Sequence, residues 1–479
     1  MTTNLYEHQK TAVEKLRKLK VGALFMEQGT GKTRTALELI SIRRDSGKAS
    51  HTIWLCPCSV KENLYRDIIK HAGYMPDDIT ICGIETLSTS YRTLNKLRDI
   101  AEHNDCCLIV DESSLVKNPS AIRTKNIVNL SLLCKYRLIL NGTPITKNEA
   151  DLFSQFYILD WRILGYQSYY SFAANHLEYD DYGKVRRCLN TDYLSEKVAP
   201  YSFQIKKDDC LDLPDKQYLN RYYMLTQEQE KEYDRVKEAY LELVKEEDEA
   251  TIYRLFTALQ LVLSGRKITS KPAERIQHVP MFDKPEDNPR IVALMDLLRL
   301  MPDKCIIYCK YVQEIHDICD IINKEYGQGS AVAFDGGLNL KKRQKSIDSF
   351  SGNARFFVAN KRCAGFGLNL QFCSNVVYYN NDFDLATRLQ SEDRIHRIGQ
   401  TEKCTYYDIV AFSKLDERIA KCLQKKENLL ESFRKEIKER NGVEVCDPDR
   451  IESPAAEKGS RKIVRRSRKN KGVLLPQQA

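Results

Sequence analysis

The sequence predicts an α/β protein with two lobes, each built on a parallel sheet covered by helices. Short apolar segments alternate with amphipathic helical patterns between residues 20 and 160, which is typical of a parallel sheet wrapped by helices. The same alternation returns between residues 304 and 410. With 479 residues, 42% of them hydrophobic, the chain is long enough for two or three domains with buried cores.

Each expected strand is a short apolar run bounded by polar or turn residues. In the first lobe these runs are residues 21–26, 51–57, 79–83, 106–110 and 136–140, with a helical pattern over 33–44. In the second lobe they are residues 304–309, 331–334, 355–359, 375–380 and 405–410.

The segment between the lobes has a different pattern. Residues 226–263 carry apolar side chains at helical spacing in two runs, separated by the acidic stretch KEEDEA, which predicts a helical hairpin. Residues 270–289 are rich in Pro, Lys and Asp, which indicates a linker that serves as the hinge. We therefore expect lobe 1 at 1–215, a helical insertion and linker at 216–285, lobe 2 at 286–440 and a basic disordered tail at 441–479.

Charge and composition narrow the class of protein without deciding it. Part of the net charge of +9 belongs to the tail, residues 441–479, which contains nine Lys and Arg residues and five Asp and Glu residues. The tail is thus either a nucleic-acid-binding arm or a solubilising terminus. The start of the chain lacks an apolar signal-like segment, so we expect a soluble, cytoplasmic protein. The 16 cysteines form no paired CxxC framework, and we expect them to be reduced and buried.

The first strand leads into EQGTGKT and then into a helical pattern, an arrangement in which backbone N–H groups surround phosphate oxygens. Gly29, Thr30 and Gly31 form the part of the loop whose backbone can approach a phosphate group closely. Lys32 can neutralise phosphates and the Thr33 hydroxyl can hold Mg²⁺. A glycine-rich turn of chance origin is the alternative, and the strand, loop and helix around this one favour a phosphate site.

Two carboxylates, Asp111 and Glu112, follow the strand at 106–110. Ligands bind at the carboxyl ends of strands in open α/β sheets. Such a pair alone is usually a solvated strand end, but after a phosphate loop Asp111 fits a partner of Mg²⁺ and Glu112 fits a base that activates water. The strand at 136–140 ends in NGTP, residues 141–144, whose small and hydroxyl-bearing side chains could sense the occupancy of that site.

In the second lobe, GFGLNL at 365–370 is followed by QSEDRIHRIGQ at 390–400. If the latter is helical, Arg394 and Arg397 lie on one face and can reach one phosphate together. The alternative is a solvated basic face paired to Glu392 or Asp393.

In this order the segments resemble the superfamily-two helicase core, and most closely its SWI/SNF-like branch. The resemblance covers residues 5–415 and is carried by LYEHQ, EQGTGKT, WLCPCSVKENLYRDI, ITICGIETL, LIVDESSLVKN, RLILNGTPITKN, KCIIYCKY, AFDGGLNLKKRQKSIDSF, RCAGFGLNL and NDFDLATRLQSEDRIHRIGQT. It implies two tandem RecA-like lobes that bind ATP and Mg²⁺ between them. It also implies that Gln9 recognises adenine and that Gln390, Arg394 and Arg397 face the γ-phosphate, the two arginines as fingers.

For nucleic acid, the resemblance implies that Pro57, Ser59 and Arg362 lie along the backbone of a duplex DNA partner. The sequence departs from the family pattern at Met26, which stands where the phosphate loop has its first glycine, and at Ser114, which replaces a frequent histidine. Phe383 and Phe366 are further departures, and none of these changes removes a group needed for hydrolysis.

The function that we expect is that of an ATP-dependent double-stranded DNA translocase of a minimal, bacterial or phage type. One alternative is a strand-separating DNA or RNA helicase with the same ATPase site. Another is an ATP-gated DNA-binding scaffold with negligible turnover, against which the intact Lys32, Asp111, Glu112 and Arg397 argue.

Overall fold

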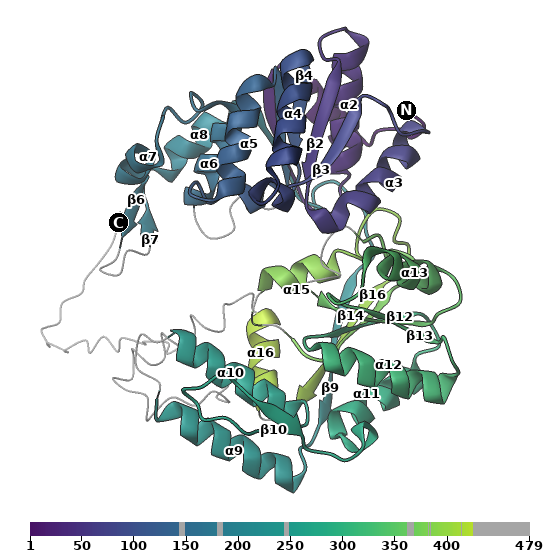
Figure 1. The fold of residues 1–479 in the computed structure, drawn as a ribbon. Helices are drawn as coiled ribbons and strands as arrows, with labels where there is room; N and C mark the ends of the chain where they lie inside the picture. The colour runs from purple at the N-terminus through teal and green to yellow at the C-terminus, as the bar shows by residue number, and fades with distance from the viewer. Residues whose placement is uncertain are drawn as a thin grey trace, which may run out of the picture.

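The computed structural model describes residues 1–142, 149–179, 185–243, 249–361, 368–381, 383, 385–412 and 414–424. Within them the chain forms two α/β lobes, each with a six-stranded parallel sheet (Figure 1). Every strand that the sequence predicted is present within one or two residues of its expected bounds.

The sheet of lobe 1 has the order β3-β2-β4-β5-β1-β8. Its strands are β1 (Val21–Met26), β2 (His51–Cys56), β3 (Ile79–Gly83), β4 (Cys106–Val110), β5 (Tyr136–Asn141) and β8 (Ser202–Ile205). Its helices are α1 (Glu7–Leu16), α2 (Lys32–Asp45), α3 (Lys61–Ala72), α4 (Tyr91–His103), α5 (Ile122–Leu133), α6 (Ala150–Asp160), α7 (Tyr169–His176) and α8 (Thr191–Val198), with a small hairpin of β6 (Leu177–Tyr179) and β7 (Val185–Cys188). The strands β1 and β4 are buried along their whole length, so this sheet lies at the centre of the lobe.

The sheet of lobe 2 has the order β13-β14-β12-β15-β16-β9. Its strands are β9 (Lys216–Tyr223), β12 (Cys305–Cys309), β13 (Ala331–Phe334), β14 (Phe356–Asn360), β15 (Asn375–Tyr378) and β16 (Cys404–Ala411). Its helices are α9 (Gln227–Leu241), α10 (Glu249–Leu263), α11 (Pro289–Leu300), α12 (Val312–Tyr326), α13 (Leu340–Ser351), α15 (Leu385–Glu392) and α16 (Leu415–Gln424). Strands β10 (Arg266–Ile268) and β11 (His278–Pro280) pair antiparallel as a short hairpin.

The chain crosses between the lobes earlier than the sequence predicted. Strand β8 ends at Ile205 in the first sheet, and β9 begins at Lys216 as the edge of the second sheet, paired to β16 over its eight residues. The connection between the two sheets is therefore residues 206–215, and residues 270–289, where the sequence predicted the linker into lobe 2, follow a strand that already belongs to the second sheet. The sequence of β9, KQYLNRYY, lacks an apolar run because an edge strand is only partly buried, so backbone pairing rather than hydrophobic pattern identifies it.

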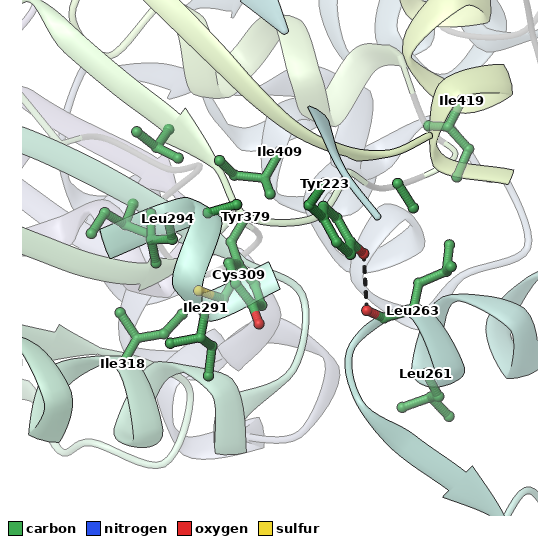
Figure 2. Close-up of a cluster of buried hydrophobic side chains, with 14 of the residues drawn as sticks. Tyr223, Leu261, Leu263, Ile291, Leu294, Cys309, Ile318, Tyr379, Ile409 and Ile419 are labelled. Carbon is green, nitrogen blue, oxygen red and sulfur yellow. Dashed lines mark hydrogen bonds between the residues drawn. The ribbon is translucent and has the colours of Figure 1, made fainter. Parts of the chain in front are cut away.

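The predicted helical hairpin is confirmed as α9 and α10, and it packs against the core of lobe 2. Figure 2 shows Leu263 of α10 beside Tyr223 of β9, whose hydroxyl donates to the carbonyl oxygen of Leu263 at 3.0 Å. The hairpin is thus held by the strand that precedes it, through buried apolar contacts and this hydrogen bond. The turn between the helices, residues 244–248, lies outside the described residues.

The structure also bears on the state of the cysteines and on membrane-spanning helices. Cysteines in the part of the chain that the structure describes are free thiols, and most of them are buried. Burial raises the pKa of the Cys106 thiol to about 11 and that of Cys319 to about 12, so these thiols stay protonated and unreactive at neutral pH. None of the helices that the structure describes has the length and apolar content needed to span a bilayer.

Candidate nucleotide site between the lobes

The candidate site begins at three adjacent strand ends. Strand β5 lies between β4 and β1, and all three run parallel. Their carboxyl ends therefore bring the loop after Met26, the carboxylate of Asp111 and the side chain of Asn141 to one edge of the sheet. The glycine loop and the acidic pair, about 80 residues apart in sequence, meet here because a single strand separates β1 from β4.

The glycine loop needs both of its glycines. Gly29 and Gly31 have φ of +84° and +91°, in the left-handed region that side chains disfavour. A Cβ on Gly31 would lie 2.1 Å from Nε2 of Gln9, and one on Gly29 would lie 2.7 Å from Cβ of Arg397 in lobe 2. The loop is thus closely approached from both sides, by the N-terminal helix and by the other lobe.

Lys32 starts helix α2 and points back over the loop. Its Nζ donates to the carbonyl oxygen of Met26 at 2.9 Å. Burial lowers the pKa of Lys32, while the nearby carboxylates of Glu112 and Asp111 oppose that shift. A buried ammonium at a helix N-terminus gains from a bound anion, and a phosphate group fits both charge and position.

The acidic pair lies opposite Lys32. Burial and then the neighbouring Glu112 raise the pKa of Asp111 to about 7, against the lowering effect of Lys32. The backbone N–H of Glu112 donates to Oδ1 of Asp111 at 2.9 Å. Glu112 adopts φ +50° and ψ +52°, a strained conformation for a residue with a side chain. The corner therefore holds two neighbouring carboxyl groups whose mutual repulsion a bound cation would reduce.

A cavity of about 530 Å³ adjoins the glycine loop and is lined by both lobes. Lobe 1 contributes Tyr6, Gln9 and Thr33, and lobe 2 contributes Asn369 and Arg397. The buried amide of Gln9 donates to the Thr30 carbonyl oxygen at 3.1 Å and accepts from the Tyr6 N–H at 3.1 Å. The N-terminal segment thus forms a polar wall of this cavity beside the glycine loop.

The two arginines reach the site from lobe 2, on a turn instead of the helix considered from the sequence. Helix α15 ends at Glu392, and the chain then tightens into turns in which the His396 and Ile395 N–H groups both bond the Glu392 carbonyl oxygen. Nη2 of Arg394 donates to Oε1 of Gln28 in the phosphate loop at 3.1 Å. The helix considered for 390–400 therefore ends at Glu392 (α15 in Figure 1), and the turn after it brings Arg394 and Arg397 to the glycine loop.

Arg397 is held inside the cleft by polar groups of lobe 2. Its Nη1 donates to Oδ1 of Asn369, whose own amide donates to Oδ1 of Asp67 on α3 at 3.2 Å. Burial, and then the neighbouring Arg394, lower the pKa of Arg397 to about 10. Gln390 lies partly buried on α15.

Two family models match this chain. The SNF2-related domain matches residues 8–274, and the helicase conserved C-terminal domain matches residues 289–399. The chain belongs to the SNF2-related family of helicase-like ATPases.

Relatives of this SNF2-related chain are distant and much longer. It is 24% identical over 451 residues to an uncharacterized ATP-dependent helicase, MG018, of Mycoplasma genitalium, covering 89% of this chain and 42% of that protein. It is 24% identical over 410 residues to the DNA excision repair protein ERCC-6 of Mus musculus, covering 79% and 26%. Among solved structures, the Sulfolobus solfataricus SWI2/SNF2 ATPase core in complex with dsDNA is 24% identical, with 92% and 94% coverage and a TM-score of 0.41. The chain spans less than half the length of these curated relatives.

The residues expected along nucleic acid are partly described. Pro57 is buried just before the 3₁₀ turn η1 (Cys58–Val60), and Ser59 is exposed on that turn. A second cavity of about 430 Å³ lies between the lobes there. It is lined by Ser59 and Lys61 of lobe 1 and by Lys341 and Arg343 of lobe 2. Arg362, residues 143–144 and residues 365–367 lie outside the described residues.

Sequence reasoning missed two residues of this SNF2-related site. Asp67 lines the nucleotide cavity from α3, and Lys207 contacts the glycine loop and the arginine turn from the connection between the lobes. Asp67 lies within the WLCPCSVKENLYRDI segment, but nothing in that pattern directs its carboxylate to this cavity, and Lys207 lies outside the segments that carry the resemblance. Lys207 belongs to the charged run KKDD, a pattern typical of a solvated segment. Its burial results from the packing of both lobes around it, which only the tertiary structure shows.

Proposed function

We propose that this protein hydrolyses Mg·ATP between its lobes and uses the resulting opening and closing to move along duplex DNA without separating its strands. The observation that carries the proposal is the convergence of Lys32 from lobe 1 with Arg394 and Arg397 from lobe 2 on one glycine loop. This loop faces Asp111 and Glu112. Cations on both lobes that meet one phosphate couple hydrolysis to lobe closure.

Each group has a distinct task in this proposal. The loop N–H groups and Lys32 bind the β- and γ-phosphates, and Thr33 and Asp111 would hold Mg²⁺, which neutralises phosphate charge when bound. Glu112 accepts a proton from the attacking water. Arg394 and Arg397 stabilise the charge that develops on the transferred phosphoryl group, and a phosphate beside Arg397 offsets the burial that lowers its pKa.

The proposed duplex DNA partner rests on family membership and on the second cavity. Ser59 and Lys61 on lobe 1 face Lys341 and Arg343 on lobe 2 across that cavity. Hydroxyl and cationic side chains bind backbone phosphates without reading sequence. Because the contacts belong to different lobes, closure would change their separation along the DNA. We expect binding that weakens steeply with salt.

The first test compares steady-state ATPase activity with duplex DNA, single-stranded DNA and RNA, in the wild type and in Glu112→Gln. We expect duplex DNA to stimulate turnover most and Glu112→Gln to remove it. Equal turnover without nucleic acid would contradict the proposal, as would activity that survives in Glu112→Gln. Negligible turnover under all conditions would favour an ATP-gated scaffold.

Movement is tested by displacement of a third strand from an intact duplex, beside a forked duplex that reports unwinding. We expect ATP-dependent triplex displacement without fork separation. Efficient fork separation, or stimulation by RNA alone, would show a strand-separating helicase and leave the ATP-site assignments in place.

A further inference from the structure

Lys207 occupies a position that joins three parts of the nucleotide site. It lies in the connection between β8 and β9, so its backbone belongs to the segment shared by both lobes. Only 3% of the residue is exposed. Its backbone N–H donates to Oε2 of Glu27, the first residue of the glycine loop, at 2.8 Å. Its Cε would lie 3.5 Å from a Cβ on Gly29, so its aliphatic stem passes beside that loop.

The ammonium group of Lys207 is directed at the turn that carries the arginines. Nζ donates to Oδ1 of Asp393 and, at 2.9 Å, to the carbonyl oxygen of His396. Asp393 immediately precedes Arg394, and His396 immediately precedes Arg397. One ammonium group therefore binds the residue before each arginine.

The end of this connection and the start of β9 make further contacts to the turn and to the last residue of α15. The ring Nε2 of His396 is 3.0 Å from the carbonyl oxygen of Pro214, and Nζ of Lys216 is 3.2 Å from Oε2 of Glu392. A buried ion pair with additional hydrogen bonds favours one arrangement over its alternatives, because any other leaves a desolvated charge unpaired. The turn is thus fixed relative to the glycine loop through the connection.

We propose that Lys207 is the positioning residue that aligns Arg394 and Arg397 with the phosphates when the lobes close. The inference rests on the proposed ATPase function and goes beyond it by assigning a role to a residue whose ammonium group bonds the arginine turn. Because the Lys207 ammonium bonds the turn that carries the arginines, its loss should weaken stabilisation of the transition state more than binding of the nucleotide in the ground state.

The test uses the full chain and the variants Lys207→Met, which keeps the stem, and Lys207→Met/Asp393→Asn, which also removes the carboxylate left behind. We expect ADP affinity within about threefold of wild type and turnover lowered by about 100-fold, the effect of a misplacement near 1 Å. Affinity for ADP with aluminium fluoride should fall in parallel with turnover. Lys207→Arg, which keeps a cation, should recover part of the loss.

Two further measurements separate positioning from a general structural role. In an Arg397→Ala background, Lys207→Met should add less than its own single effect, because both act through the same arginine turn. The control Lys414→Met removes a lysine–glutamate pair of lobe 2, 2.8 Å from Glu230, and should leave turnover unchanged.

Full turnover in Lys207→Met and in Lys207→Met/Asp393→Asn would overturn the inference. So would a loss of turnover from Lys207→Met that is as large in the Arg397→Ala background as in the wild type. If the wild type itself hydrolyses no ATP with any nucleic acid, the proposed function fails instead, so the two failures are distinguishable. Should Lys207→Met be unfolded by circular dichroism, the double variant, which buries no lone carboxylate at position 393, decides the question.

Discussion

The contact between Gly31 and Gln9 predicts an unusually large effect for the small substitution Gly31→Ala. At φ +91° an alanine costs about 1 kcal/mol relative to glycine. Its Cβ would lie 2.1 Å from Nε2 of Gln9, so the amide must move. Moving it breaks hydrogen bonds to the Thr30 carbonyl oxygen and from the Tyr6 N–H, each worth about 1 kcal/mol. The expected total is about 3 kcal/mol.

Gly47 is the matched control. It has φ +64°, and a Cβ there would meet nothing within 4 Å, so Gly47→Ala should cost only about 1 kcal/mol. In a Gln9→Ala background the amide is already gone, and Gly31→Ala should also cost about 1 kcal/mol. Nucleotide affinity should fall for Gly31→Ala and stay unchanged for Gly47→Ala.

The assay is urea unfolding followed by tryptophan fluorescence. The chain has two tryptophans, Trp54 and Trp161, and both belong to lobe 1, so the signal reports the lobe that carries Gly31. Equal destabilisation by Gly31→Ala and Gly47→Ala would refute the argument. So would a Gly31→Ala effect of the same size with and without Gln9.

Other predictions concern the chemistry of the same site. Lys32→Ala should abolish tight ATP binding, whereas Glu112→Gln should retain binding and stop hydrolysis; equal ATP affinity of Lys32→Ala and wild type in a titration would contradict the assignment. Arg397→Ala should keep ATP affinity and lower single-turnover hydrolysis by about 10³-fold, and retention of most activity would exclude Arg397 from the catalytic groups. The pKa of Asp111, raised from 3.8 to about 7, means that its protonated form favours the folded state. Its contribution to stability is therefore full below about pH 4 and lost as pH rises through about 7, so urea unfolding should show Asp111→Asn stabilising lobe 1 at pH 8 more than at pH 5.

Sequence reasoning placed the glycine loop and the acidic pair at strand ends, as the structure has them, because these residues follow buried strands. The strand before Gly29 and the strand before Asp111 are continuous apolar runs, and such runs have a strong signal. The edge strand β9 carries no such signal, and the linker into lobe 2 was therefore expected at 270–289, whereas the connection between the two sheets is residues 206–215. The helical pattern of 390–400 continued past Glu392 in sequence, but the turn after it is held by contacts with other segments.

The amino-acid sequence by itself determined two parallel-sheet lobes, the glycine loop with Lys32 and Thr33, and the acidic pair, because local periodicity and short-range spacing specify these features. Only the tertiary structure decided which groups meet across the cleft. Arg394 reaches Gln28, Asn369 bridges Arg397 to Asp67, and Lys207 joins the glycine loop to the arginine turn. Apart from the bond between Arg397 and Asn369 within lobe 2, these contacts join residues 180 to 366 positions apart. A pattern in one local window contains no information on which distant surfaces become neighbours.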